Sequence, residues 1–348
     1  MGRAVIEIEP SIAPDELAAM LQSVGNDGLG ARFVHVLHGP DVPENFNLMR
    51  MARTRPLARR CLVELTRRGY YAYLVKDGAT RFVRSDRVGG VWVKITENEY
   101  RINEEEIVFR VEPPLEEKPP KRLVVVFSAV HEFPNRASLQ RYFSQDFPSI
   151  RKYLPHGTAV LRIADLGGVV GAFYLNTAHR PHNADAIRRL IESTRGELGI
   201  DPDRVVLFGV SKGGTGALYH GLTGGYRFVS VDPILSDEHY ETHYDDSHYT
   251  RGGIFTEPKE ATFMRLLETA VAPDGKCALI CSENSPQFET ISRLLFPRFA
   301  GTMSIFNARD ESITEHKEVG PRTINISVML LSMQLHGLAV PAGLHDVD

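Results

Sequence analysis

Short apolar segments alternate with longer amphipathic ones over the last two thirds of the chain. Ala184–Glu197 repeats apolar residues at helical spacing, and a C-terminal helix is predicted around Ile324–Leu335. Six mostly apolar segments have the length of buried strands: Leu123–Phe127, Thr158–Ala164, Val205–Phe208, Phe228–Val231, Cys277–Cys281 and Met303–Asn307. Strands and helices that alternate in this way predict a mostly parallel sheet covered by helices on both faces.

One predicted strand leads into a motif with a known backbone geometry. The strand is followed by Gly209-Val210-Ser211-Lys212-Gly213 and then by small, helix-compatible residues. Strand, G-x-S-x-G and helix form a nucleophile elbow, in which a strained turn raises the serine hydroxyl above the sheet edge. Together with the order of elements, this motif predicts an α/β-hydrolase fold over residues 121–348, with Ser211 as nucleophile. A plain strand–helix turn is the alternative interpretation, because the bare pattern also occurs by chance.

The first third of the chain has a different pattern. Two helical segments precede a β-hairpin whose turn is Lys76-Asp77-Gly78, and Val91–Ile95 and Ile107–Val111 are further candidate strands. Two proline pairs flank a charged stretch at 113–120, which is typical of an extended linker. We therefore predict an N-terminal α+β module over residues 1–112 and a linker over 113–120. The aromatic residues of the module could recognise a polymer, but at hairpin spacing they are more typical of a core.

Composition narrows the classes of partner. The 348 residues are 43% hydrophobic and 24% charged, with a net charge of −4, so nucleic acid and anionic membranes are not favoured as partners. The absence of an apolar run near 18 residues and of a leader predicts a cytoplasmic protein without an integral membrane segment. Of three cysteines, Cys277 and Cys281 share one predicted strand and are expected in the core. We predict neither a metal nor a cofactor.

A serine nucleophile needs a histidine base, and the chain order of this fold places that histidine after the last core strand. His316 lies between the strand at Met303–Asn307 and the final helix, so it is the candidate base. Its alternative interpretation is a solvated loop histidine. Earlier histidines are expected at most to line the pocket.

The acid that orients the base is less clearly marked. Glu283 is the only carboxylate in the turn after Cys277–Cys281, where the acid usually lies, and it is our first candidate. Asp232, after the preceding strand, is the second candidate, and Asp310 could hold the imidazole of His316 locally. Each of them could also be an ordinary loop carboxylate that caps a helix or pairs with an arginine.

An oxyanion hole needs two N–H donors that point to one position. The backbone amide of Lys212 is expected to supply one, and Ala129, after the first core strand, the other. The side chain of Lys212 is expected to be solvated or to meet an anionic substrate.

Several motifs resemble those of a known family. Over most of its length, the chain resembles the XcbB/CpsF family of capsular polysaccharide biosynthesis proteins. The motifs that carry the resemblance are Ser211-Lys212-Gly213-Gly214-Thr215-Gly216-Ala217-Leu218-Tyr219, Arg67-Arg68-Gly69-Tyr70 and Lys76–Val83. The S-K-G-G-T-G stretch is also similar to an accessory Sec-system protein, an α/β-hydrolase-like protein linked to acetylation of glycan on exported adhesins. The resemblance implies the fold and a Ser–acid–His site. Related sequences have an Asp where Ser285 stands, so Glu283 must substitute for it or the triad is degenerate.

These observations predict a serine-dependent acyl-handling enzyme, either an esterase or an O-acyltransferase. Ser211 would form an acyl-enzyme, and the acyl group would pass to water or to an acceptor hydroxyl on a polysaccharide or another biosynthetic intermediate. The alternative is a non-catalytic assembly partner of a glycan or natural-product biosynthesis system that retains the fold. A P-loop is excluded because Gly213, rather than Ser or Thr, follows Lys212. The acyl donor, the acceptor and the oligomeric state stay open.

Overall fold

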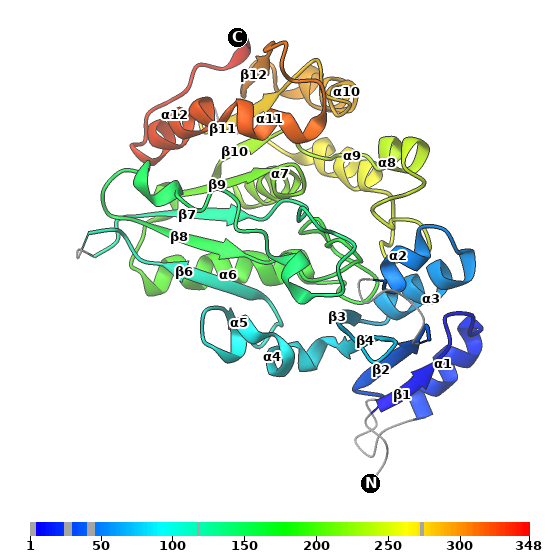
Figure 1. The fold of residues 1–348 in the computed structure, drawn as a ribbon. Helices are drawn as coiled ribbons and strands as arrows, with labels where there is room; N and C mark the ends of the chain where they lie inside the picture. The colour runs from blue at the N-terminus through cyan, green and yellow to red at the C-terminus, as the bar shows by residue number, and fades with distance from the viewer. Residues whose placement is uncertain (1–4, 24–29, 40–45, 117–118, 272–274) are drawn as a thin grey trace.

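Two β-sheets organise the chain in the computed structural model, which describes residues 5–23, 30–39, 46–116, 119–271 and 275–348 (Figure 1). The smaller sheet lies near the N-terminus and has the strand order β1-β2-β4-β3 among the described residues. Its strands are β1 (Val5–Ile8), β2 (Phe33–Leu37), β3 (Tyr70–Lys76) and β4 (Ala79–Arg84). The helices of this region are α1 (Pro14–Ser23), α2 (Leu48–Ala52) and α3 (Pro56–Arg67).

The larger sheet carries the candidate site. Its strand order in the described part of the chain is β13-β12-β11-β10-β9-β7-β8-β6-β5. The strands from β7 to β13 are mutually parallel, whereas β6 runs antiparallel to β8. Their bounds are β5 (Arg101–Ile102), β6 (Val108–Glu112), β7 (Arg122–Phe127), β8 (Thr158–Ile163), β9 (Val205–Val210), β10 (Arg227–Val231), β11 (Cys277–Cys281), β12 (Ser304–Ala308) and β13 (Gly343–Val347).

Helices cover both faces of this sheet because its central strands bury side chains on both sides. Along β7, Leu123 and Val125 belong to the same core cluster as α6 (Asn183–Glu197), α7 (Lys212–Gly224), α9 (Lys259–Thr269) and α10 (Phe288–Phe299). Val124 and Val126 belong to the opposite cluster, which contains residues of α11 (His316–Arg322) and α12 (Ile324–Leu335). The helix α8 (Glu238–His243) lies beyond the end of β10. The predicted α/β-hydrolase fold is thereby confirmed.

Three local features of the structure differ from the sequence analysis. The candidate strand Val91–Ile95 instead spans the end of α4 (Val88–Val91) and most of α5 (Val93–Thr96), with Trp92 extended between the two helices and edge-on against Tyr100. β5 and β6, which lie within the predicted module over residues 1–112, pair with the larger sheet. β13 is a further strand at the edge of the sheet, and its partly exposed Gly-Leu-His-Asp-Val sequence lacks the apolar pattern of the buried strands. Part of the predicted linker, 117–118, lies outside the described residues.

The two sheets share buried contacts. Tyr71 and Val83 of the smaller sheet belong to one cluster with Tyr142, Phe143 and Leu166 of the larger unit.

Within the described ranges, no helix combines the length and apolarity needed to cross a bilayer.

Candidate active site

Ser211 occupies a strained turn between β9 and α7. Its backbone has φ +58° and ψ −122°, a region that non-glycine residues rarely adopt. The glycines on either side make this turn possible. A Cβ on Gly209 would lie 2.1 Å from the carbonyl oxygen of Gly213, and one on Gly213 would lie 2.2 Å from that of Phe127. The local geometry is that of a nucleophile elbow.

A chain of hydrogen bonds connects Ser211 to a histidine and a carboxylate. Ser211 Oγ lies 2.7 Å from His316 Nε2, and His316 Nδ1 lies 2.7 Å from Asp232 Oδ2. His316 is the first residue of α11, which a capping box between Glu315 and Glu318 fixes at its N-terminus. The side chain of Asp232 is fully buried and that of His316 is 15% exposed. A proton on Nδ1 that is donated to Asp232 leaves Nε2 free to accept the Ser211 proton.

Asp232, rather than Glu283, lies beside His316. Glu283 accepts a hydrogen bond from the Asn307 side chain at 3.0 Å and lies 3.6 Å from Arg309, with its side chain 45% exposed. It therefore faces the strands beyond β11, away from the nucleophile. Asp310 instead accepts hydrogen bonds from the amide and hydroxyl of Ser312.

Ser285 contributes to this arrangement at a position that the sequence analysis had connected with a lost acid. Its Oγ donates to Asp232 Oδ2 at 2.5 Å, the same oxygen that His316 contacts. Asp232 Oδ1 has no hydrogen-bond partner among the described residues. The two donors at Oδ2 hold the carboxylate in one orientation toward the imidazole.

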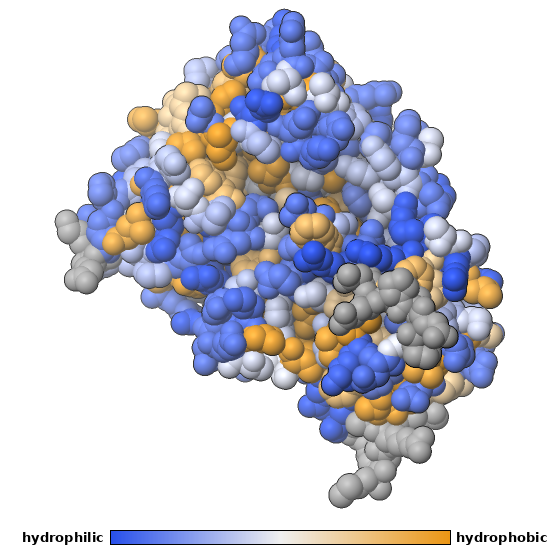
Figure 2. Space-filling model, viewed as in Figure 1, coloured by the Kyte–Doolittle hydropathy of each residue, from blue (hydrophilic) through white to orange (hydrophobic). Residues whose placement is uncertain are grey.

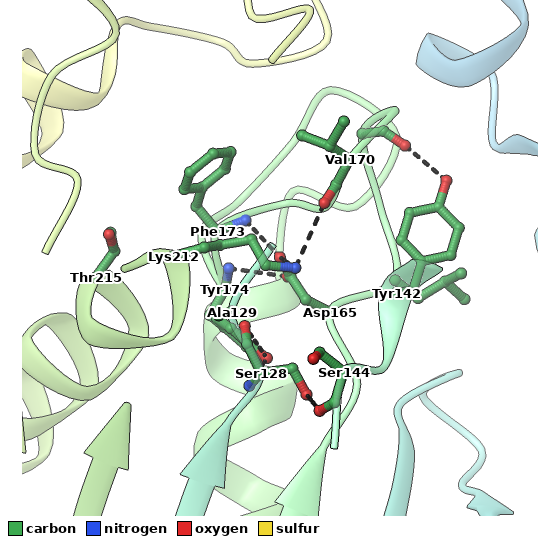
Figure 3. A network of polar contacts seen from close by, with 12 residues as sticks. Ser128, Ala129, Tyr142, Ser144, Asp165, Val170, Phe173, Tyr174, Lys212 and Thr215 are labelled. Atoms are coloured by element: carbon green, nitrogen blue, oxygen red, sulfur yellow. Dashed lines mark hydrogen bonds and ion pairs between the residues drawn. The ribbon is translucent and has the colours of Figure 1, made fainter. Parts of the chain in front are cut away.

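The Lys212 side chain is buried, in contrast to the expectation that it is solvated. Its Nζ lies 3.0 Å from Asp165 Oδ2 and donates to the carbonyl of Val170 at 3.4 Å (Figure 3). Asp165 also accepts the backbone amides of Phe173 and Tyr174. A charge inside a protein needs such a partner. This network therefore fixes the loop 165–174 beneath the elbow.

The Ala129 amide, our second oxyanion candidate, is already engaged. It donates to a carboxylate oxygen of Asp146, and the other oxygen of Asp146 accepts the Ser144 hydroxyl at 2.7 Å. Burial raises the pKa of Asp146. Nothing in the sequence pointed to Asp146, which lies in an irregular segment after β7 and reaches the site only through the fold.

A cavity of about 490 Å³ opens beside Ser211 and His316. Apolar side chains form most of its wall, and apolar residues gather around α11 and α12 on the face shown in Figure 2. Asp146, Tyr240, His248 and Lys317 are the other polar lining residues. His248 packs against Tyr240, with ring centroids 3.7 Å apart, and burial holds the pKa of His248 well below its usual value. Sequence reasoning missed both residues because the intervening segment carries no recognisable motif.

The fold and this Ser–His–Asp arrangement define an α/β-hydrolase-type protein. Among the described residues, no group of three or more His, Cys, Asp or Glu side chains could hold a metal ion.

Comparison with known proteins adds distant structural likenesses. No family model and no curated protein matches the chain. An S-formylglutathione hydrolase from Agrobacterium tumefaciens is 15% identical with a TM-score of 0.48, over 68% of this chain and 94% of that chain. The capsule O-acetyltransferase of Neisseria meningitidis serogroup A is 15% identical with a TM-score of 0.48, over 66% and 93%. A chain of the Glycosylation Associate Protein (Gap123) complex from Streptococcus agalactiae is 17% identical with a TM-score of 0.45, over 66% of this chain but only 45% of that one.

Proposed function

We propose that the protein is a serine-dependent acyl-handling enzyme, an esterase or an O-acyltransferase. The observation that carries the proposal is the continuous contact from Ser211 Oγ through His316 to Asp232, with both distances 2.7 Å. A hydroxyl hydrogen-bonded to an imidazole, which is itself oriented by a buried carboxylate, is the arrangement that activates serine.

The reaction then has two steps. Ser211 Oγ attacks the acyl carbonyl carbon while its proton passes to His316 Nε2, and the bond to the leaving group breaks as that proton is transferred to it. Water or an acceptor hydroxyl next gives a proton to His316 Nε2 and attacks the acyl carbonyl carbon. The bond from that carbon to Ser211 Oγ then breaks, and His316 returns the proton to Oγ. Asp232 keeps the proton on Nδ1 and stabilises the imidazolium that forms in each step.

Negative charge on the carbonyl oxygen requires backbone donors. Lys212, at the N-terminus of α7, would supply one amide, and Ala129 would supply a second once Asp146 no longer accepts its hydrogen bond. The acceptor that we propose is a polysaccharide or another biosynthetic intermediate, on the motif resemblance described above.

Activity-based labelling tests this proposal. A fluorophosphonate probe is expected to label the wild-type protein and to fail with Ser211→Ala, because only an activated serine reacts. Ser292→Ala on α10, outside the pocket lining, serves as the matched control and should label like wild type. Hydrolysis of p-nitrophenyl acetate should follow the same pattern. Unlabelled wild-type protein that folds normally would contradict the proposal and favour the assembly-partner alternative.

A further inference from the structure

The cavity beside Ser211 also restricts the kind of acyl group that the site can accept. Ser211 and His316 form part of its wall, so whatever fills it lies next to the reacting atoms. Six apolar residues complete much of the lining, two of them from β9: Val130, Phe147, Phe208, Val210, Ile234 and Ile324.

Size and polarity both restrict the occupant. A volume of about 490 Å³ lies within the range of sites that enclose whole small molecules, so a two-carbon acetyl group would leave most of it unfilled. Besides the reacting groups, the polar lining residues are Asp146, Tyr240, His248 and Lys317, and the rest of the wall is apolar. A sugar ring against the apolar part would lose water from its hydroxyls at a cost. An alkyl chain has no hydrogen bonds to lose there and gains from its transfer out of water.

Part of the apolar wall of the cavity is also left accessible, because no other described part of the protein packs against it. Val130, Phe147, Val210 and Ile324 are each only partly buried, although the strand and helices that carry them pack densely elsewhere. On α11, a Cβ at Gly320 would lie 2.6 Å from Val210, so the helix already approaches β9 closely and cannot close the cavity by moving inward. The apolar surface therefore remains available to a ligand.

We propose that the acyl group handled by this site is an apolar chain considerably longer than acetyl. This inference rests on the proposed function. The carbonyl carbon forms an ester bond to Ser211 Oγ as its bond to the donor oxygen or sulfur breaks, and the donor atom takes the proton from His316. The chain lies among the six apolar side chains, and a sugar or other polar acceptor approaches from the open side.

A chain-length series tests the inference. For p-nitrophenyl esters from acetate to decanoate, kcat/KM of the wild-type protein should rise with chain length to a maximum well beyond acetate. The maximum should be about a hundredfold above acetate, because each buried methylene contributes several-fold. A flat series, or a maximum at acetate, would overturn the inference.

Variants of the wall locate the chain. Ile324→Trp should lower the octanoate-to-acetate ratio of kcat/KM at least about tenfold, because the larger ring fills the cavity. Ile324→Ala should move the maximum toward longer chains. Met329→Trp lies on the same helix with its side chain 47% exposed and outside the lining, so it should reproduce the wild-type ratio. An unchanged ratio in both Ile324 variants, in folded protein, would also overturn the inference.

Failure of the inference can be told apart from failure of the proposed function. If fluorophosphonate labels Ser211 while chain length has no effect on kcat/KM, the proposed serine enzyme is supported and the proposed acyl-chain site is refuted. If wild-type protein is neither labelled nor active on any ester, both fall together.

Discussion

Two neighbouring turns of the large sheet each present a carboxylate, and only one of them reaches the histidine. Asp232 follows β10, the strand that pairs directly with β9 of the nucleophile, whereas Glu283 follows β11, one strand further away. The Ser211 amide donates to the carbonyl of Val231 at 2.9 Å, so the elbow and the end of β10 are directly connected. In this structure the carboxylate that reaches the imidazole of His316 is therefore the one that follows the strand next to β9.

The backbone and the surroundings differ between these turns as well. Asp232 has φ +43° and is fully enclosed, with Ser285 and His316 on one oxygen. Glu283 lies at the surface, where Asn307 and Arg309 neighbour it. An exposed ion pair of that kind contributes little to stability, whereas a buried carboxylate without its partners would be costly.

Replacing each acid in turn gives the largest expected contrast. Asp232→Asn should lower kcat for p-nitrophenyl ester hydrolysis by about ten-thousandfold, because the amide no longer holds the reactive imidazole tautomer. Glu283→Gln should stay within about threefold of wild type. Steady-state kinetics on both folded variants measures the two values of kcat. Equal losses of kcat would contradict a different role for the two carboxylates.

Moving the carboxylate sharpens the comparison further. Asp232→Ser combined with Ser285→Asp should recover about a hundredfold of the activity that Asp232→Ser loses, since the two side chains meet at the oxygen that contacts His316. Asp232→Ser with Asn284→Asp is the matched control, because Asn284 is exposed and lies one residue away. Equal rates for the two double variants would show that the acid must come from β10.

A third carboxylate, Asp146, occupies the Ala129 amide that was expected in the oxyanion hole, so we expect it to oppose the proposed reaction. Asp146→Ala should raise kcat/KM and the rate of fluorophosphonate labelling by about tenfold, because it frees the Ala129 amide and removes negative charge from the oxyanion position. Gln145→Ala, at the exposed neighbouring position, should have no effect. A loss of activity in Asp146→Ala would instead mean that the carboxyl positions the loop for catalysis.

Asp146 is also expected to make the stability of the folded protein depend slightly on pH. Because burial raises the pKa of Asp146 in the folded state, its ionisation costs stability at neutral pH, and this cost disappears as pH falls toward the ordinary value of 3.8. Asp146→Asn should therefore have a higher melting temperature than wild type at pH 7, and the gap should narrow in acid. Thermal melts over pH 4 to 8 measure it, and a constant gap would contradict the assigned cause.

The sequence predicted those parts of the site that depend on local chemistry. The elbow follows from glycines without which the turn would clash, and His316 follows from its place between the last core strand and the last helices. The acid could not be chosen in the same way, since Asp232 and Glu283 both follow apolar strands and only the strand order separates them. Asp146 and the buried state of Lys212 depend on long-range contacts that no local pattern records.

The enclosed ammonium of Lys212 has a consequence for the lifetime of an acylated Ser211. A primary amine adjacent to a serine ester is a competing nucleophile, and its attack would convert the ester into an inert amide. Here Asp165 and Val170 hold that amine inside the protein, with no side-chain surface left exposed. Enclosure of this amine would keep the lysine after the serine from attacking an acyl-enzyme of the kind proposed above.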